Sequence, residues 1–309
     1  MARKTFIPPQ FREKYSKIMG EEANVFFEVC RTKWPKSIWV NSLKIRPSVL
    51  KKSLEKKGWV LDDLFHENAF AISGVERPGG SEEFAQGLFN AQEKSSMLPA
   101  LVLAPKKNDL VLDATAAPGN KTLQLACLME GRGKIVAVEK NVERFKSLRF
   151  NMKKFGARNV ILKRMDLLDA KKNNLFDKAL LDAPCSSEGL VRKDFEALKN
   201  WSQELVEKKA ALQKKLLAKT IELLKEGGEV VYSTCSLSPE ENEEVVQSAL
   251  DAGGAKILGF EFAGMKLRQG FRGYNGKKFD GSISKCARIY PQDNDSQGFF
   301  IAKIRKTAT

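Results

Sequence analysis

Histidine is nearly absent from this chain of 309 residues, in which His66 is the only one. The five cysteines lie far apart, and no two of them form a CxxC pair. The sequence therefore has no cluster of metal ligands, and its odd, scattered cysteines do not indicate a disulfide framework. We expect no metal site, and any one cysteine taken alone is expected in a buried core position.

Long apolar runs are also absent. No stretch reaches the roughly 18 apolar residues that a membrane span needs, and the start MARKTFIPPQ lacks an apolar secretory segment. Hydrophobic residues still make up 42% of the sequence, which is enough for one large core. We expect a globular, cytoplasmic and monomeric protein without membrane contact.

Acidic residues do not balance the basic ones, and the net charge is +15. Residues 1–60 hold 14 Lys and Arg against 5 acids, and residues 256–309 hold 11 against 4, whereas the middle is close to neutral. Basic flanks around a neutral centre are the electrostatic footprint of a polyanion partner. The charge pattern therefore predicts a nucleic acid as the partner.

From residue 109 onward, short apolar runs alternate with helical patterns. The predicted strands are DLVLDA (109–114), KIVAVE (134–139), NVILKRM (159–165), FDKALLD (176–182), GEVVYST (228–234), KILGFEF (256–262) and GFFIAKI (298–304). The predicted helices cover residues 121–129, 141–155, 202–225 and 239–251. This alternation predicts an α/β fold with a doubly wound, mainly parallel sheet of seven strands. In such sheets the ligand binds at the carboxyl ends of the strands.

A smaller module precedes this sheet. SIWVNSLKI, the helix-like RPSVLKKSLEKKG and WVLDDLFHENAFAIS predict a β-α-β arrangement over about residues 37–75. The Gly- and Pro-rich stretch SGVERPGGSEEFAQG joins the two parts. We expect a basic N-terminal module over residues 1–80 and a Rossmann-like catalytic domain over residues 81–309.

The segment LVLDATAAPGNKT indicates a strand, a tight turn and a helix start. Pro118 and Gly119 let the backbone approach a ligand, and the helix dipole favours a polar or charged group there. A phosphate-binding P-loop is excluded because Asn120 separates Gly119 from Lys121. A nicotinamide turn of the G-x-G-x-x-G type is disfavoured because only one glycine is present.

Doubly wound enzymes that bind S-adenosylmethionine tolerate a turn with fewer glycines than nicotinamide-binding folds need. Asp113 ends the first strand, and Glu139 ends the second, where it is placed to bind ribose hydroxyls. Asp166, just past the third strand, is placed to reach the adenine amino group. We favour this cofactor, although an acid at the position of Glu139 would serve a dinucleotide equally well.

Two thiols follow the next two strands. The fourth strand ends in DAPCSSEG, which contains Asp182 and Cys185, and the fifth ends in STCS, which contains Cys235. If these strands are parallel neighbours, both sulfurs lie beside one pocket, an arrangement that core packing does not explain. SPEE (238–241) predicts a capping box, which puts Cys235 just before a helix amino end, where thiolate is favoured.

With DATAAPGNKT, DAPCSSEG and YSTCSLSPEENE together, the sequence resembles the Sun/Fmu family of RNA cytosine-5 methyltransferases. The resemblance extends over most of the chain and includes VNSLK (40–44), AQEKSSMLPALVL (91–103) and RIYPQDNDSQGFFIAKI (288–304). It implies a class I S-adenosylmethionine-dependent methyltransferase whose N-terminal module is RRM-like and binds RNA.

The resemblance also implies a role for each thiol. Cys235 would bond to carbon 6 of cytosine, which makes carbon 5 nucleophilic, and Cys185 would assist release of the product. Asp182 would contact the ring nitrogen and exocyclic amine of the base. Lys121 would either orient Asp182 or approach the cofactor.

The match to the family also implies binding residues, and it shows two positions at which this sequence departs from the family's pattern. The residues matched to the cofactor pocket are Ala116, Ala117, Pro118, Gly119, Asn120, Lys121, Glu139, Arg144, Asp166 and Asp182. Asn41 and Lys44, within VNSLK, are matched to the RNA-facing part. Gln292 stands where histidine usually follows RIYP, which argues against a protonatable role there. Asn120 replaces a glycine or serine, and we expect no loss of cofactor binding because Asn tolerates unusual backbone angles.

A compact chain with a short N-terminal module resembles the archaeal members that methylate transfer RNA, and ribosomal RNA is the alternative with the same motifs. A non-catalytic RNA-binding assembly factor would have no need to keep Asp182, Cys185, Cys235 and the cofactor turn together. Methylation of DNA cytosine uses the Pro-Cys thiol as its nucleophile, so the Thr-Cys motif argues against it. We therefore predict an RNA (cytosine-5) methyltransferase that acts on transfer RNA.

Overall fold

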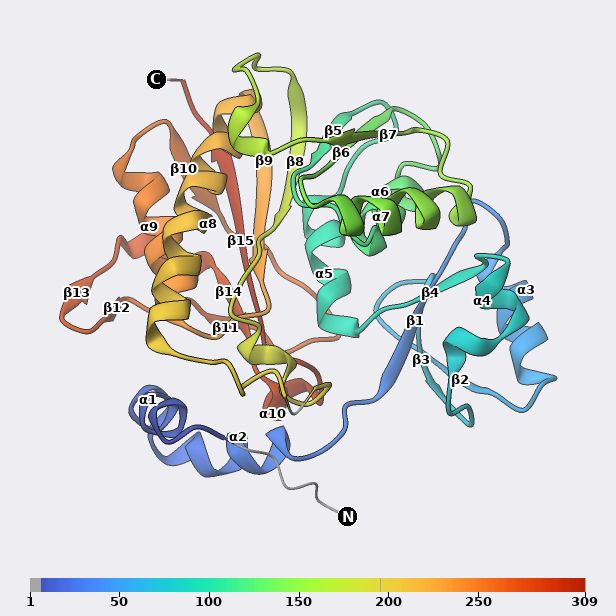
Figure 1. Cartoon of the computed structure of the whole chain (residues 1–309), viewed down its shortest axis with the longest axis horizontal. Helices are drawn as coiled ribbons and strands as arrows, with labels where there is room; N and C mark the ends of the chain where they lie inside the picture. The colour runs from blue at the N-terminus through green and yellow to red at the C-terminus, as the bar shows by residue number, and fades with distance from the viewer. Residues whose placement is uncertain (1–6, 195, 309) are drawn as a thin grey trace.

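The structure is a computed structural model that describes residues 7–194 and 196–308. Two helices, α1 (Pro9–Met19) and α2 (Ala23–Cys30), come first, a small four-stranded sheet follows, and a nine-stranded sheet makes up most of the rest. Figure 1 shows the small sheet beside the larger domain, with α1 and α2 lying across one end of the latter. In the described ranges, no helix combines the length and the apolar character that a membrane span requires.

The predicted β-α-β module is present and is part of a larger unit. Its elements in chain order are β1 (Lys36–Val40), α3 (Pro47–Glu55), β2 (Val60–Asp63), β3 (Ala69–Ser73), α4 (Glu82–Ala85) and β4 (Phe89–Ala91). With the antiparallel order β2-β3-β1-β4, this connectivity is the βαββαβ arrangement of ferredoxin-like domains. Because β4 pairs with β1, the sheet continues past the boundary predicted at residue 80.

Both faces of the small sheet are buried. Ile38 and Val40 pack against α3 on one face, whereas Trp39 and Ala69 join the core of the large domain on the other. Trp39 has no exposed surface, and its ring stacks on that of His66 with 4.8 Å between the ring centroids. Alternation along β1 therefore directs successive side chains into two cores, and the two domains share one hydrophobic cluster.

The large sheet confirms the predicted α/β fold with a mainly parallel sheet. Its strand order is β11-β14-β15-β9-β8-β5-β6-β7, and β10 pairs with the end of β15. The strands β5 to β9 run parallel, whereas β15 is antiparallel to β9. All seven predicted strands are present, and the short strands β11 and β14 are additional. The strands are β5 (Leu110–Asp113), β6 (Lys134–Glu139), β7 (Val160–Arg164), β8 (Phe176–Asp182), β9 (Leu224–Thr234), β10 (Ala255–Leu258), β11 (Arg268–Gln269), β14 (Ala287–Ile289) and β15 (Phe299–Lys306), with β12 (Gly273–Tyr274) and β13 (Lys277–Lys278) in a separate hairpin.

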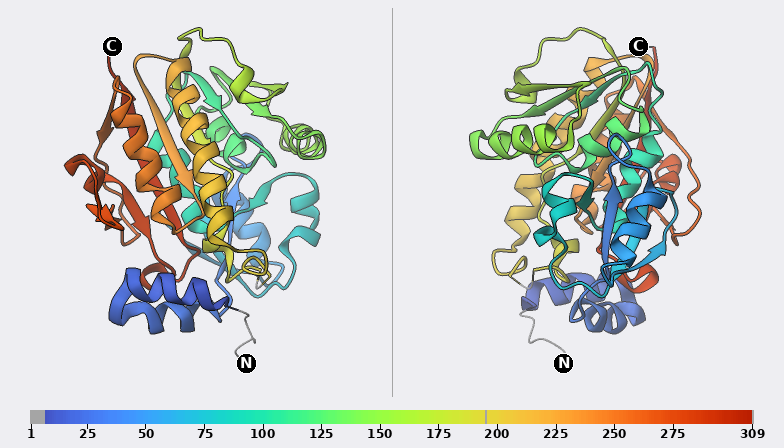
Figure 2. Two further views of the ribbon diagram at one scale, coloured as in Figure 1. Left: turned by 60° about the vertical axis from the view of Figure 1, so that its left-hand side comes forward. Right: turned by 90° about the vertical axis from the view of Figure 1, so that its right-hand side faces the viewer.

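Helices cover both faces of the large sheet. Val111 and Leu180 belong to the cluster that contains α5, α6 and α7, whereas their neighbours Leu112 and Leu181 belong to the cluster that contains α8 and α9. Figure 2 shows α8 and α9 side by side along their face. The helices are α5 (Lys94–Leu103), α6 (Asn120–Leu128), α7 (Val142–Phe155), α8 (Gln203–Leu223), α9 (Glu243–Asp251) and the short α10 (Pro291–Asn294).

Three of the four predicted helices, α6, α7 and α8, lie within two residues of their predicted bounds. The fourth, predicted over residues 239–251, is divided at Asn242 into a 3-10 turn (Pro239–Glu241) and α9. The predicted capping box is wrong, because the Ser238 side chain makes no cap hydrogen bond. Its hydroxyl donates instead to the carboxylate of Glu188, which lies in the loop after β8.

The sequence did not predict α1 and α2, and these helices pack on the large domain rather than on the small one. Phe11 and Tyr15 of α1 are fully buried in a cluster that includes Trp201 and Leu237. Trp201 follows the first thiol motif in the chain, and Leu237 follows the second. The helix α1 therefore covers the two segments that follow the thiols in the chain.

Docking of α2 can be tested with two adjacent residues. Phe26 is fully buried, whereas the side chain of Val25 is 56% exposed. We expect Phe26→Ala to lower the free energy of unfolding by about 3–5 kcal/mol, because it leaves a cavity, and Val25→Ala to change it by less than about 0.5 kcal/mol. Urea unfolding followed by circular dichroism measures both values. Equal losses in the two variants would show that α2 is not packed as described.

Candidate active site

One cavity of about 510 Å³ lies at the carboxyl ends of the parallel strands, the edge at which this fold binds ligands. Every strand from β5 to β9 contributes a lining residue at or just past its end. These residues include Thr115, Glu139, Asp166, Asp182, Cys185 and Cys235. The fold thus brings three of the predicted acids and both thiols to a single site, whereas Asp113 is buried behind it and accepts a hydrogen bond from Thr122.

The turn after β5 is fixed by α7. The guanidinium group of Arg144 donates to the carbonyl oxygen of Ala117 (2.6 Å), and the amide of Asn151 donates to that of Pro118 (2.9 Å). Gly119 has a φ of 108°, and an added Cβ would lie 2.6 Å from a side-chain carbon of α7, so only glycine fits. Four of the predicted cofactor residues shape this turn without lining the cavity: Ala116, Ala117, Pro118 and Gly119.

Two acids of the cavity wall are held in place by their neighbours. The carboxylate of Glu139 accepts a hydrogen bond from the backbone N–H of Asn141 (2.8 Å), and Arg144 lies 3.6 Å away. The carboxylate of Asp166 caps the short 3-10 turn that follows it, and Lys140 lies 3.3 Å from one of its oxygens. Both acids therefore present fixed acceptors to the cavity, as hydroxyl and amino groups of a nucleoside require.

Asp182, the last residue of β8, is held from three sides. The ammonium group of Lys121 donates to its Oδ2 (2.6 Å), and the hydroxyl of Ser233 donates to its Oδ1 (2.9 Å). Thr115 donates to its backbone carbonyl oxygen (2.8 Å). Lys121 thus orients Asp182, which is one of the two roles expected of it, while the carboxylate of Asp182 remains 34% exposed toward solvent.

The two thiols meet. Asp182 pairs with Ser233 in the parallel register of β8 and β9, and just past these residues the Sγ atoms of Cys185 and Cys235 lie 3.0 Å apart as free thiols. The contact with Cys235, together with burial, raises the pKa of the Cys185 thiol well above its usual range. Cys185 therefore keeps its proton at neutral pH, and its thiol can donate that proton to the Cys235 sulfur.

A second cavity, of about 330 Å³, shares a wall with the first. Asp182, Ala183 and Cys235 line both cavities. The second also has aromatic and basic side chains, which are the groups that stack on bases and bind phosphates: Trp34, Lys36, Lys193 and the predicted cofactor residue Lys121, next to Asn120. The nucleophile candidate thus stands between two compartments of different character.

The two predicted RNA-binding residues differ in their surroundings. Asn41 is fully buried, and its amide donates to the carbonyl oxygens of Gly87 and Phe155 (2.8 Å each). It joins the small domain to the end of α7 and offers no surface to RNA, so the prediction for Asn41 is wrong. Lys44 is exposed and donates to two backbone carbonyl oxygens, one of them in α7. An RNA contact at Lys44 stays a prediction.

Sequence reasoning missed several residues of this site. Ser233 stands two positions before Cys235, and parallel pairing opposite Asp182 was the signal that could have found it. No pattern in the sequence pointed to Trp34, because it lies in a segment without regular secondary structure. Gln292, at the place of the expected histidine, lines neither cavity. Both of its polar side-chain atoms are buried without a hydrogen-bond partner in the part of the chain that the structure describes.

A doubly wound sheet with a tight glycine turn after its first strand and an acid ending the second defines a class I S-adenosylmethionine-dependent methyltransferase. Residues 100–305 match the family described as 16S rRNA methyltransferase RsmB/F, and residues 7–94 match the N-terminal domain of 16S rRNA methyltransferase RsmF. The chain belongs to this family of S-adenosylmethionine-dependent RNA methyltransferases, and the resemblance to the Sun/Fmu family is confirmed.

Its relatives carry names of two kinds. Ribosomal RNA small subunit methyltransferase F of Vibrio vulnificus is 39% identical over 324 residues, which cover 100% of this chain and 66% of that protein. The tRNA (cytosine(49)-C(5))-methyltransferase of Pyrococcus abyssi is 36% identical over 304 residues, which cover 95% of this chain and 94% of that protein. The crystal structure of NSun6 from Pyrococcus horikoshii with SFG is 26% identical, with a TM-score of 0.84 over 98% of this chain and 99% of that chain.

The glycine of the first turn provides a test of the cofactor pocket. We expect Gly119→Ala to weaken binding of S-adenosylmethionine about tenfold, because the positive φ and the contact with α7 displace the turn. Isothermal titration calorimetry with wild type and variant measures the change. Gly281→Ala is the control, because a Cβ there meets nothing within 4 Å. Unchanged affinity in Gly119→Ala would remove this turn from the cofactor pocket.

Proposed function

We propose that this protein methylates carbon 5 of cytosine in RNA, with Cys235 as the nucleophile and Cys185 assisting release. The observation that carries the proposal is the pair of free thiols, 3.0 Å apart, on the wall of the cofactor-sized cavity. Cys235 also lines the second cavity, so its sulfur can meet a base that enters from that side. An isolated core cysteine would need neither arrangement.

The first cavity fits S-adenosylmethionine. Glu139 would accept hydrogen bonds from the ribose hydroxyls, and Asp166 would accept one from the adenine amino group. Arg144, which itself lines the cavity, holds the turn after β5 in place. When bound, the cofactor supplies an electrophilic methyl group.

The protein's own side chains prepare the base for attack. The thiolate of Cys235 adds to carbon 6, and the electron pair of the C5=C6 bond moves to carbon 5, which becomes the nucleophile. Asp182, fixed by Lys121 and Ser233, would contact the ring nitrogen and amine as electron density shifts toward them. After methylation, a water molecule in the site takes the proton from carbon 5, and the C5–H electron pair re-forms the C5=C6 bond. The bond between carbon 6 and sulfur then breaks, and its electron pair returns to the Cys235 sulfur as thiolate.

Cys185 assists this last step as a hydrogen-bond donor. Its thiol keeps its proton and lies at 3.0 Å from the Cys235 sulfur. Donation to the departing thiolate stabilises the charge that forms on Cys235. Loss of this donor leaves the covalent adduct intact and slows its breakdown.

Transfer RNA is the proposed substrate. Support comes from the P. abyssi relative, which is 36% identical to this chain and matches it over 94% of its own length. Ribosomal RNA is the second candidate, supported by the 39% identity to the Vibrio relative and by the family name. This chain spans about two thirds of the Vibrio protein, which therefore carries a further segment.

The roles of the thiols predict opposite effects of two alanine variants. With labelled S-adenosylmethionine and either transfer RNA or ribosomal RNA, Cys235→Ala should give neither 5-methylcytosine nor a denaturation-resistant adduct. Cys185→Ala should accumulate the adduct. The substrate is the RNA that carries the label, as mass spectrometry of its nucleosides shows. An adduct that persists in Cys235→Ala and disappears in Cys185→Ala would reverse the assignment, and no transfer by wild type to either RNA would favour an assembly factor.

Trp34 provides a test of the second cavity. We expect Trp34→Ala to raise KM for the RNA about tenfold, because stacking on one base contributes about 1–3 kcal/mol, and to leave the affinity for S-adenosylmethionine unchanged. Phe150→Ala is the control, since Phe150 is an aromatic residue of α7 that is 67% exposed and lines neither cavity. Equal KM values for Trp34→Ala and wild type would show that RNA does not enter by this side.

A further inference from the structure

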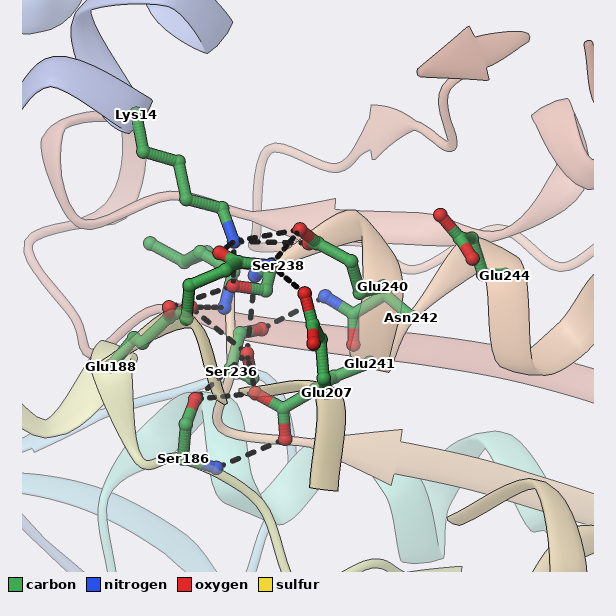
Figure 3. Close-up of polar contacts among 12 residues, drawn as sticks. Lys14, Ser186, Glu188, Glu207, Ser236, Ser238, Glu240, Glu241, Asn242 and Glu244 are labelled. Carbon is green, nitrogen blue, oxygen red and sulfur yellow. Dashed lines mark hydrogen bonds and ion pairs between the residues drawn. The ribbon is translucent and has the colours of Figure 1, made fainter. Parts of the chain in front are cut away.

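Two fully buried glutamates lie behind the thiols and belong to the two thiol motifs themselves. Glu188 stands three residues after Cys185, and Glu241 stands six residues after Cys235. Figure 3 shows both carboxylates with Ser236 between them and Lys14 of α1 approaching from the side. Buried carboxylates are costly unless hydrogen-bonded or protonated, so this pair requires a specific account.

Each glutamate binds the other thiol's loop. Glu188 accepts hydrogen bonds from the backbone N–H of Leu237 (3.0 Å) and the hydroxyl of Ser238 (2.7 Å). Glu241 accepts one from the backbone N–H of Ser186 (3.0 Å), the residue that follows Cys185. We call this reciprocal arrangement of Glu188, Glu241 and Ser236 the clasp. Ser238 does not cap a helix because its hydroxyl donates to Glu188 of the clasp.

Glu241 reaches both sides of Cys185. Gln213 of α8 donates to the carboxylate of Glu241 (2.7 Å) and also lies 3.0 Å from the carbonyl oxygen of Pro184. Ser186 contacts the same carboxylate through its N–H and its hydroxyl. The residues before and after Cys185 are therefore both tied to Glu241.

The hydrogen atoms at Ser236 determine the protonation of the clasp. Its Oγ lies 2.9 Å from Glu188 and 2.7 Å from Glu241, and it accepts from the backbone N–H of Ser238 (3.1 Å). A hydroxyl has one proton to donate, so it can bind only one of the two carboxylates. The other contact needs a proton from the carboxyl group itself, because two bare oxygens repel at that distance.

The proton belongs on Glu241. Glu188 already has four other donors, so a proton on Glu188 itself would face one of them, whereas an ionised carboxylate accepts from all of them. They are the hydroxyl of Tyr15 (2.5 Å), the indole N–H of Trp201 (2.6 Å), the N–H of Leu237 and the hydroxyl of Ser238. Glu241 has three donors besides Ser236, from Ser186 and Gln213, and one position is left. A protonated Glu241 can donate to Ser236, whose own proton then goes to Glu188.

The surrounding charges favour the same assignment. Lys14 of α1 pairs with Glu240 (3.0 Å), and Arg288 of β14 pairs with Glu243, so those charges cancel locally. Glu188 has no ion pair within residues 7–194 and 196–308 and therefore repels a second anion. Cys185, Tyr15 and Tyr232 also face the pair, and their pKa values all lie well above their usual range, so they are neutral at pH 7. Tyr274 lies nearby, and burial raises its pKa to about 12, so it is neutral as well.

We propose that Glu241 is a positioning residue for Cys185 that works in its protonated form, with its proton passed through Ser236 toward the ionised Glu188. This inference rests on the proposed function for the role of Cys185 in release. Burial and then the charge of Glu188 raise the pKa of Glu241 to about 7. Ionisation of Glu241 places a second anion behind Cys185, which disfavours charge on both thiols and repels Glu188. Release should therefore slow as the pH rises above 7.

Paired glutamine substitutions test the assignment, because glutamine copies a protonated glutamate. Glu241→Gln can still accept from Ser186 and donate to Ser236, so we expect kcat at pH 7 within about threefold of wild type and no decline between pH 7 and 8.5. Glu188→Gln turns two acceptor positions into donors that face other donors, so we expect kcat to fall at least about thirtyfold. KM for RNA should not change in Glu241→Gln. Equal loss in both variants, or a pH decline retained in Glu241→Gln, would overturn the proposal.

Two further readouts need no RNA, so they separate this inference from the proposed function. A glutamate whose pKa is higher in the folded state contributes stability that is present below about pH 4.5 and is lost as the pH rises through about 7. Wild type should lose more thermal stability than Glu241→Gln between pH 5 and 8.5. The comparison isolates Glu241, since Asp113, with its pKa also raised to about 7, is common to both proteins.

The second readout is the reactivity of Cys185 itself. Limited alkylation with iodoacetamide at pH 8, with peptide mass analysis, should label Cys185 about three- to tenfold faster in Glu241→Gln than in wild type, because the anion behind the thiol is gone. Equal labelling and equal pH dependence of the melting temperature would contradict a protonated Glu241 even in an inactive protein. A Glu241→Gln variant that fails to fold would contradict it as well, since the neutral side chain is expected to fit.

Discussion

The approach of two sulfurs to 3.0 Å is the constraint on which the rest of the site depends. Parallel pairing of β8 and β9 brings the two chain segments to the same edge, because Asp182 lies opposite Ser233. Pairing alone does not fix the loops beyond the strands. The clasp does so, since each loop supplies the carboxylate that the other loop's donors require. The strands thus set the position of the thiols, and buried polar groups set their separation.

Local patterns in the sequence were sufficient for the parts of the fold that alternate. Short apolar runs predicted β5 to β9, and the motifs around Cys185 and Cys235 predicted a site at their ends. The strands β11 and β14 are only two and three residues long, which is too short to show such a pattern. The capping box failed for a tertiary reason, because Ser238 and Glu241 hydrogen-bond across to the other loop. A local signal cannot show that its donor has a better partner far away in the chain.

The shared core of the two domains explains the misassigned Asn41. VNSLK has two apolar residues among five, which suits an edge strand that faces RNA as well as a strand packed on another domain. Only the tertiary arrangement shows that Trp39 and Asn41 are enclosed between the small sheet and α7. With one face on α3 and the other on the catalytic domain, this sheet cannot offer an open face to RNA as a free-standing module would. Its edges and loops, with Trp34 and Lys44, remain for that purpose.

The bond between Tyr15 and Glu188 joins residues that are 173 positions apart. A ribosome adds about 5–20 residues each second, so α1 leaves it roughly 10–35 s before its partners exist. During that time its aromatic residues can meet only one another and those of α2, since their other neighbours come from the segments after the thiols. The first helix to be synthesised is thus among the last to dock. The thiol loops are completed only when nearly the whole chain has been made, and a truncated chain would have both cysteines without the contacts that align them.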